Sequence, residues 1–111
     1  MKLSLSKFEA LALQTARDTA FPLPVTGFLL DVVIVDCVAF GHIYAHVKAD
    51  PLTGRFTDGH LIHTSAIATF HEHAGFVILH TRNSHYVCVL SEADKDELLR
   101  HLKWLSKPTL H

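Results

Sequence analysis

The fold is decided by residues 76–90, which read FVILHTRNSHYVCVL. Two apolar, β-branched runs flank the polar pair Asn83-Ser84, and this pattern predicts a β-hairpin with a two-residue turn. Across that turn Arg82 would pair with His85. Because side chains alternate between the two faces of a strand, the hairpin has a core face and a polar face. The core face carries Val77, Leu79, Cys88 and Leu90. The polar face carries His80, Arg82 and His85.

Upstream of the hairpin the sequence also predicts β-structure. A strand-like run covers residues 28–48, and Gly41 inside it indicates a bulge or bend. Residues 28–38 are rich in Val, Ile and Leu, so we expect them to be buried on both faces or covered by a partner. Turns are predicted at 50–54 and at Asp58-Gly59, followed by a strand over 66–72.

Two helices are predicted to flank this β region, which covers about residues 27–90. The first covers about 6–20, where Ser6 and Glu9 form a capping box. Its apolar stripe comprises Phe8, Leu11, Ala12, Ala16 and Ala20. The second helix covers about 92–105, with Ser91 as its N-cap. We therefore expect one α+β domain over residues 1–111, built on a curved antiparallel sheet or a small open SH3-like barrel of five to six strands.

Composition excludes several classes of protein. Of the 111 residues 49% are apolar, which excludes a disordered chain. The formal net charge is −1, so the basic excess typical of proteins that bind nucleic acid polymers is absent. The apolar content exceeds what so small a domain needs, and this predicts a homo-oligomer.

The same reasoning predicts a cytoplasmic protein. Residues 1–7 lack the pattern of a signal peptide. The most apolar stretch, residues 28–40, is too short to span a bilayer and contains two aspartates, so no membrane association is expected. Cys37 and Cys88 both lie in apolar runs, and we expect both to be buried, reduced and inert.

Two groups of polar residues are candidates for binding. His80, Arg82 and His85 lie beside Asn83 and suit an anionic ligand, although a solvated sheet face would have the same pattern. The second group surrounds Arg55. Within it, Thr64 and Ser65 offer hydroxyls and amides to a phosphate, with an ordinary hydrogen-bonded loop as the alternative.

The sequence contains no pattern typical of an enzyme or of a cofactor site. Neither a GxSxG motif nor a phosphate-binding glycine loop occurs. Two histidine pairs, His71 with His73 and His42 with His46, would each share a strand face. A zinc site needs a third ligand, however, and there is no HExxH or CxxC motif.

Two segments resemble a known family. They are residues 54–67, GRFTDGHLIHTSAI, and residues 81–86, TRNSHY. Together they are similar to the phage-encoded Thoeris anti-defence sponge family, whose members are small β-rich oligomers that sequester cyclic ADP-ribose signals without cleaving them. The resemblance implies that Arg82 and Asn83 face a nucleotide, that Phe56 or Tyr86 stacks on the base, and that the protein acts inside a bacterial host cell.

The function expected from the sequence is non-enzymatic capture of a small anionic, nucleotide-like ligand without a cofactor. Two alternatives stay open. One is a protein-protein interaction or inhibitor module with no small ligand, in which the strand at 28–38 meets a partner protein. The other is a metal-binding protein that uses histidine ligands.

Overall fold

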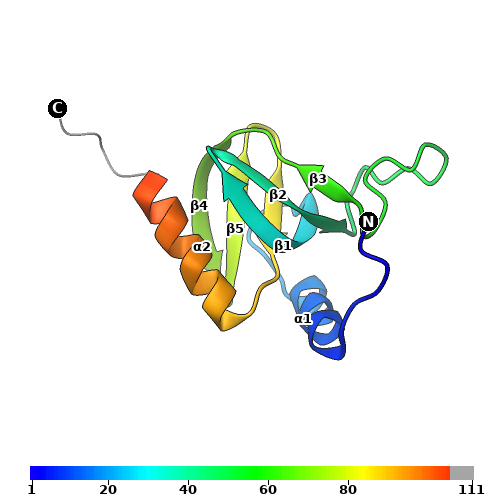
Figure 1. Cartoon of the computed structure of the whole chain (residues 1–111), viewed down its shortest axis with the longest axis horizontal. Helices are drawn as coiled ribbons and strands as arrows, with labels where there is room; N and C mark the ends of the chain where they lie inside the picture. Colours follow the sequence, from blue (N-terminus) through cyan, green and yellow to red (C-terminus); the bar gives the residue numbers. More distant parts are fainter. Residues whose placement is uncertain (106–111) are drawn as a thin grey trace.

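The computed structural model describes residues 1–105, which form a six-stranded sheet with one helix on each face (Figure 1). In chain order the elements are α1 (Lys7–Asp18), β1 (Gly27–Val35), β2 (Val38–Tyr44), β3 (Leu61–His63), β4 (Ile67–His73), β5 (Phe76–Thr81), β6 (His85–Cys88) and α2 (Glu92–Leu105). The expected α+β architecture, with two flanking helices, is confirmed.

The sheet is mixed and open. Its strand order is β3-β2-β1-β6-β5-β4, and every neighbouring pair is antiparallel except β1 and β6, which run parallel. The expectation of a wholly antiparallel sheet is corrected at this central pair. The parallel pair arises because the chain crosses from the edge strand β3 to the opposite edge strand β4, so that β6 returns beside β1. Figure 1 shows the resulting twist, with β4 and β5 running across the direction of β1 and β2.

The run over residues 28–48, expected as one long strand, is a hairpin. Val35 pairs with Val38, and Asp36 and Cys37 form the turn between them. Asp36 adopts a positive φ of 55°, a conformation that aspartate tolerates better than most residues. Cys37 is consequently exposed at the turn, so the expectation that it is buried was wrong.

The irregularity expected at Gly41 lies opposite it, in β1. Leu30 pairs with His42 and Val33 with Phe40, so two residues of β1 face the single residue Gly41. Asp31, the first of these two, has a φ of 55°. A Cβ atom on Gly41 would lie 3.0 Å from the Leu30 carbonyl oxygen, which explains why glycine occupies this position.

The last hairpin forms with a longer loop than expected. His80 pairs with His85, and Val77 with Cys88, which shifts the predicted register by two residues. A shift of two preserves the faces, because side chains alternate with a period of two. Cys88 is therefore buried in the core as expected, although its partner is Val77.

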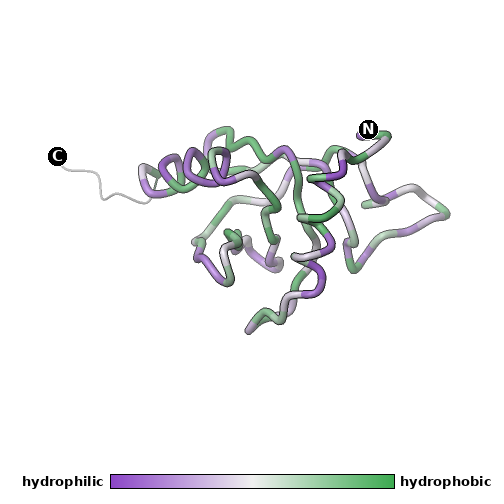
Figure 2. Tube along the Cα trace, turned by 90° about the horizontal axis from the view of Figure 1, so that it is seen from below, coloured by the Kyte–Doolittle hydropathy of each residue, from purple (hydrophilic) through white to green (hydrophobic). Residues whose placement is uncertain are grey.

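Two apolar cores lie on opposite faces of the sheet. On one face Leu98, Leu99 and Leu102 of α2 pack against Leu29, Ile43 and Leu79, among others. On the other face Leu13 and Ala16 of α1 pack against Phe28, Leu30, Ile78 and Val87. Figure 2 shows apolar and polar positions alternating along α2, as a helix with one buried side requires.

Helix α1 begins as predicted, but its apolar face is only partly buried. Its capping box forms, with Ser6 Oγ accepting from the Glu9 N–H at 3.0 Å. Phe8 and Leu11, however, are 64% and 69% exposed, so only part of the predicted apolar stripe is buried. Within residues 1–105, neither helix combines the length and the apolar character that crossing a bilayer requires.

Candidate functional site

Three histidines from adjacent strands meet at one end of the sheet face that α1 covers. They are His71 of β4, His80 of β5 and His85 of β6, called here the histidine cluster. His71 Nδ1 lies 2.6 Å from His80 Nε2, and the ring centroids of His80 and His85 are 4.7 Å apart. All three side chains are half-buried. The structure therefore brings together the two predicted histidines, His80 and His85, and adds a third.

Hydrogen bonds fix the orientation of the cluster. His85 Nδ1 lies 3.0 Å from the carbonyl oxygen of Pro24, and because a carbonyl only accepts, Nδ1 carries the proton. The His85 backbone N–H donates to Thr26 Oγ1 at 3.0 Å. These bonds leave His85 Nε2 without a proton in the neutral ring, so this atom gains one when the ring becomes charged.

The surroundings of the cluster affect the protonation of His80. Burial, followed by the neighbouring charges of His71 and His85, lowers the pKa of His80 below its ordinary value. Three imidazolium groups at this spacing would repel one another. A bound anion would relieve that repulsion, so anion binding and proton uptake should be coupled at this site.

Arg82 and Asn83 occupy the turn that joins β5 to β6. Both side chains are exposed, and within residues 1–105 neither makes a hydrogen bond or an ion pair. The turn that carries this permanently positive residue and this amide connects His80 to His85.

A second group of aromatic side chains lies at the same end of the sheet, on the other face. Phe56 stacks on His46, with ring centroids 4.0 Å apart and planes 5° apart. The Arg55 Cζ atom lies 4.9 Å from the Phe56 centroid, a cation–π contact. Tyr86 Oη completes the group, 3.3 Å from His46 Nε2.

The protonation state of His46 follows from its partners. The Lys48 backbone N–H donates to His46 Nδ1 at 2.9 Å, so the neutral ring carries its proton on Nε2 and donates it to Tyr86. Burial, then the charges of Lys48 and Arg55, lowers the pKa of His46. This ring is a neutral, structural histidine.

Tyr86 does not stand where the resemblance implies. It is only 6% exposed and belongs to the core beneath α2, on the face opposite His85. Strand alternation explains this, because Tyr86 is adjacent to His85 in the chain and two residues from the buried Cys88. Phe56 remains half-buried but lies with Tyr86, not with the histidine cluster.

Thr64 and Ser65 are separated from the other candidates. The Thr64 hydroxyl donates to the Ser65 carbonyl at 2.7 Å and accepts from the Ala39 N–H at 3.1 Å. Thr64 is buried, and both hydrogen bonds of its hydroxyl join backbone groups at the end of the β2–β3 pair. Ser65 is exposed. Thr64 therefore fits the alternative interpretation of an ordinary hydrogen-bonded loop.

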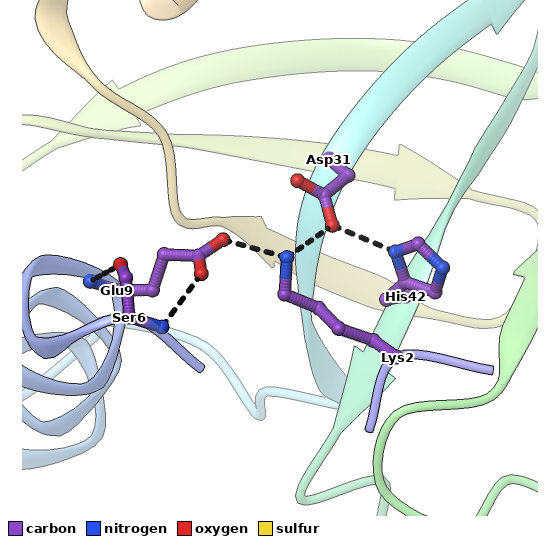
Figure 3. A network of polar contacts seen from close by, with 5 residues as sticks. All are labelled: Lys2, Ser6, Glu9, Asp31 and His42. Atoms are coloured by element: carbon purple, nitrogen blue, oxygen red, sulfur yellow. Dashed lines mark hydrogen bonds and ion pairs between the residues drawn. The ribbon is translucent and has the colours of Figure 1, made fainter. Parts of the chain in front are cut away.

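In each of the two histidine pairs considered as metal ligands, one histidine is hydrogen-bonded to a different partner. His73 Nε2 lies 3.1 Å from the Ala20 carbonyl oxygen, away from His71. His42 Nδ1 lies 2.7 Å from an Asp31 carboxylate oxygen, in a network with Lys2 and Glu9 (Figure 3). Within residues 1–105 no group of three or more His, Cys, Asp or Glu side chains has the arrangement to hold a metal ion.

Sequence reasoning missed His71 as a member of the cluster. It depends on β4 pairing with β5 so that Thr69 faces His80, which sets His71 on the diagonal. The alternation of His71 and His73 indicated that both side chains lie on one strand face, but the sequence did not indicate which residues of β5 they pair with.

No protein-family model, curated protein or solved structure matches this chain, so the resemblance of residues 54–67 and 81–86 to the anti-defence family stays a prediction.

Proposed function

We propose that this chain is a non-enzymatic binding protein that captures a small anionic, nucleotide-like ligand at the histidine cluster. The observation that supports it best is the meeting of His71, His80 and His85, with ring centroids 4.7 Å apart in each neighbouring pair. Arg82 and Asn83 in the adjoining turn complete the proposed site. Polar groups converging at the end of a sheet suit a ligand that carries phosphate.

The chemistry of capture follows from the groups present. Arg82 keeps its charge at any working pH and offers a bidentate fork to two oxygen atoms. Each proton that the histidines take up adds a positive charge beside the anion. Binding is therefore expected to strengthen as the pH falls through the histidine range. Capture needs only affinity, so no nucleophile or general base is required.

The finer parts of the proposal come from the sequence. The ligand is a cyclic nucleotide signal, held in the cytoplasm of a bacterial host by a homo-oligomer with an anti-defence role. The resemblance of residues 54–67 and 81–86 supports the ligand class. Exposed apolar side chains such as Leu11, Val47 and Leu61 support self-association. The burial of Tyr86 leaves Phe56 as the aromatic candidate.

The test measures binding of cyclic ADP-ribose and of inorganic phosphate by calorimetry at pH 6.0 and pH 7.5. Arg82→Ala should weaken binding by about 10- to 150-fold, the loss expected for one charged hydrogen-bonding contact. Arg17→Ala is the matched control, because it removes an exposed arginine from α1. The proposal fails if neither compound binds, or if the Arg82 and Arg17 variants bind equally well.

A further inference from the structure

The strand β1 is longer than the strand it pairs with on one side. Along one edge β1 pairs with β2 as far as Val35. Along the other edge it pairs with β6 only from Gly27 to Leu29, and the last bond there is from the Val89 N–H to the Leu29 carbonyl at 2.8 Å. Within residues 1–105, no strand continues that edge past Leu29. The second half of β1 therefore has an open edge inside the sheet.

This open edge lies in a groove. The groove has a volume of about 510 Å³ and is walled by β1, by the segment that leads from β6 to α2, and by both helices. Its apolar lining includes Val32, Ile34, Leu90 and Leu98. Val33, also in the wall, is 57% exposed, so apolar surface is accessible there. The groove thus offers an apolar surface beside a strand edge.

The rim of the groove is acidic. Four carboxylates line it: Glu9, Asp31, Asp94 and Glu97. Lys2 neutralises part of this charge, because its Nζ lies 2.8 Å from Glu9 and 3.0 Å from Asp31 (Figure 3). On α2, the carboxylates of Asp94 and Glu97 make no ion pair within residues 1–105.

Asp31, one of the four carboxylates of the rim, is held in its charged form. Burial opposes ionisation of Asp31, but its hydrogen bonds to Lys2 and His42 hold its pKa below the ordinary value. Among residues 1–105, His101 is the only side chain lining the groove that can become positive. A ligand of matching charge must therefore be basic.

We propose that the groove binds an extended, basic segment of a partner protein, which adds as a strand along the open edge of β1. Its backbone would hydrogen-bond to β1, alternate apolar side chains would enter the groove, and Lys or Arg side chains would face Asp94 and Glu97. This site is separate from the histidine cluster and does not depend on anion capture.

A second copy of the same chain is a poorer occupant. A symmetric dimer through this edge would set the same carboxylates of each subunit against one another. Like charges brought together in an interface cost binding energy. The recessed position of the edge, between two helices, also hinders pairing of two folded sheets. Charge and access together favour a basic, flexible segment.

The experiment uses the full chain and the octapeptide Lys-Val-Lys-Val-Lys-Val-Lys-Val, with binding followed by fluorescence anisotropy. The double variant Asp94→Asn/Glu97→Gln should weaken binding by about 2- to 30-fold, the range for two exposed ion pairs. The matched control is Asp96→Asn/Glu72→Gln, which removes two exposed carboxylates outside the groove. It should bind the peptide as the unchanged chain does.

Two further measurements distinguish strand addition from general attraction between charges. A peptide N-methylated at alternate amides cannot complete a β-ladder and should not bind. Hydrogen exchange should slow at residues 31–35 when the unmethylated peptide is present. The proposal is overturned if the octapeptide fails to bind, if the N-methylated peptide binds equally well, or if both double variants lose affinity alike. It is also overturned if the free chain is a dimer that already protects residues 31–35.

Discussion

Replacing Thr64 with valine tests whether its hydroxyl serves the fold or a ligand. Valine keeps the shape of threonine but removes the hydroxyl that accepts from the Ala39 N–H at 3.1 Å and donates to the Ser65 carbonyl at 2.7 Å. Ala39 is wholly buried, with 0% exposure, so water cannot replace the lost acceptor. The Ser65 carbonyl belongs to an exposed residue and can find water.

The cost follows from that difference. Leaving one buried N–H without a partner destabilises a protein by about 1–3 kcal/mol, whereas an exposed carbonyl contributes little. For a domain of this size each kcal/mol lowers Tm by roughly 4 °C, so Thr64→Val should lower Tm by about 4–12 °C. The free energy of unfolding is measured by urea titration followed by circular dichroism.

Ser65→Ala provides the comparison. This exposed neighbour should change the free energy of unfolding by less than about 0.5 kcal/mol. Binding of inorganic phosphate should be the same in both variants, since neither side chain is placed at the histidine cluster. The reasoning is refuted if Thr64→Val is as stable as the unchanged chain, or if it stays folded and loses phosphate binding.

Three further predictions concern a thiol, a pH response and a glycine. Cys37 should react with a thiol reagent in the folded protein while Cys88 does not, because burial raises the pKa of Cys88; labelling followed by mass spectrometry of peptides decides it, and equal rates would contradict the fold. Burial lowers the pKa of His80 below 6.5, so the folded state takes up its proton later than the unfolded state and the free energy of unfolding should fall as the pH drops below about 6.5. Urea titrations at pH 7.5 and 5.5 test this, and His80→Gln should reduce the difference. Gly59→Ala should lower Tm, because the added Cβ would lie 2.5 Å from the Lys2 carbonyl oxygen at a φ of 87°; an unchanged melting curve would count against the placement of the N-terminal segment.

Local signals in the sequence predicted the elements that local interactions build. The capping box of Ser6 and Glu9 marked the start of α1 to within a residue, because both partners lie in the same helical turn. The hairpin at Asp36 was missed because its turn sits within a β-branched run and contains neither glycine nor proline. The parallel β1–β6 pair could not be predicted from the sequence, because contacts between distant segments leave no periodic signal.

In the candidate site, too, only the contacts within one hairpin could be predicted from the sequence. His80 and His85 were placed together because one hairpin holds both. His71 required the register of another strand pair. The alternation that buries Cys88 also predicts the buried position found for Tyr86, whereas the stacking role of Tyr86 was implied by the resemblance alone.

The strand order divides the sheet into two contiguous meanders, β1–β2–β3 and β4–β5–β6, and among the described residues the strand pairing that joins them is three residues of β1 facing three residues of β6. Each meander closes through neighbouring segments of the chain and can form early in folding, whereas the seam between Leu29 and Cys88 must wait for a long loop to close. We therefore expect the seam to limit the folding rate. A chain cut in the exposed link at residues 65–66, between the two meanders, should still yield halves that reassemble into the same sheet.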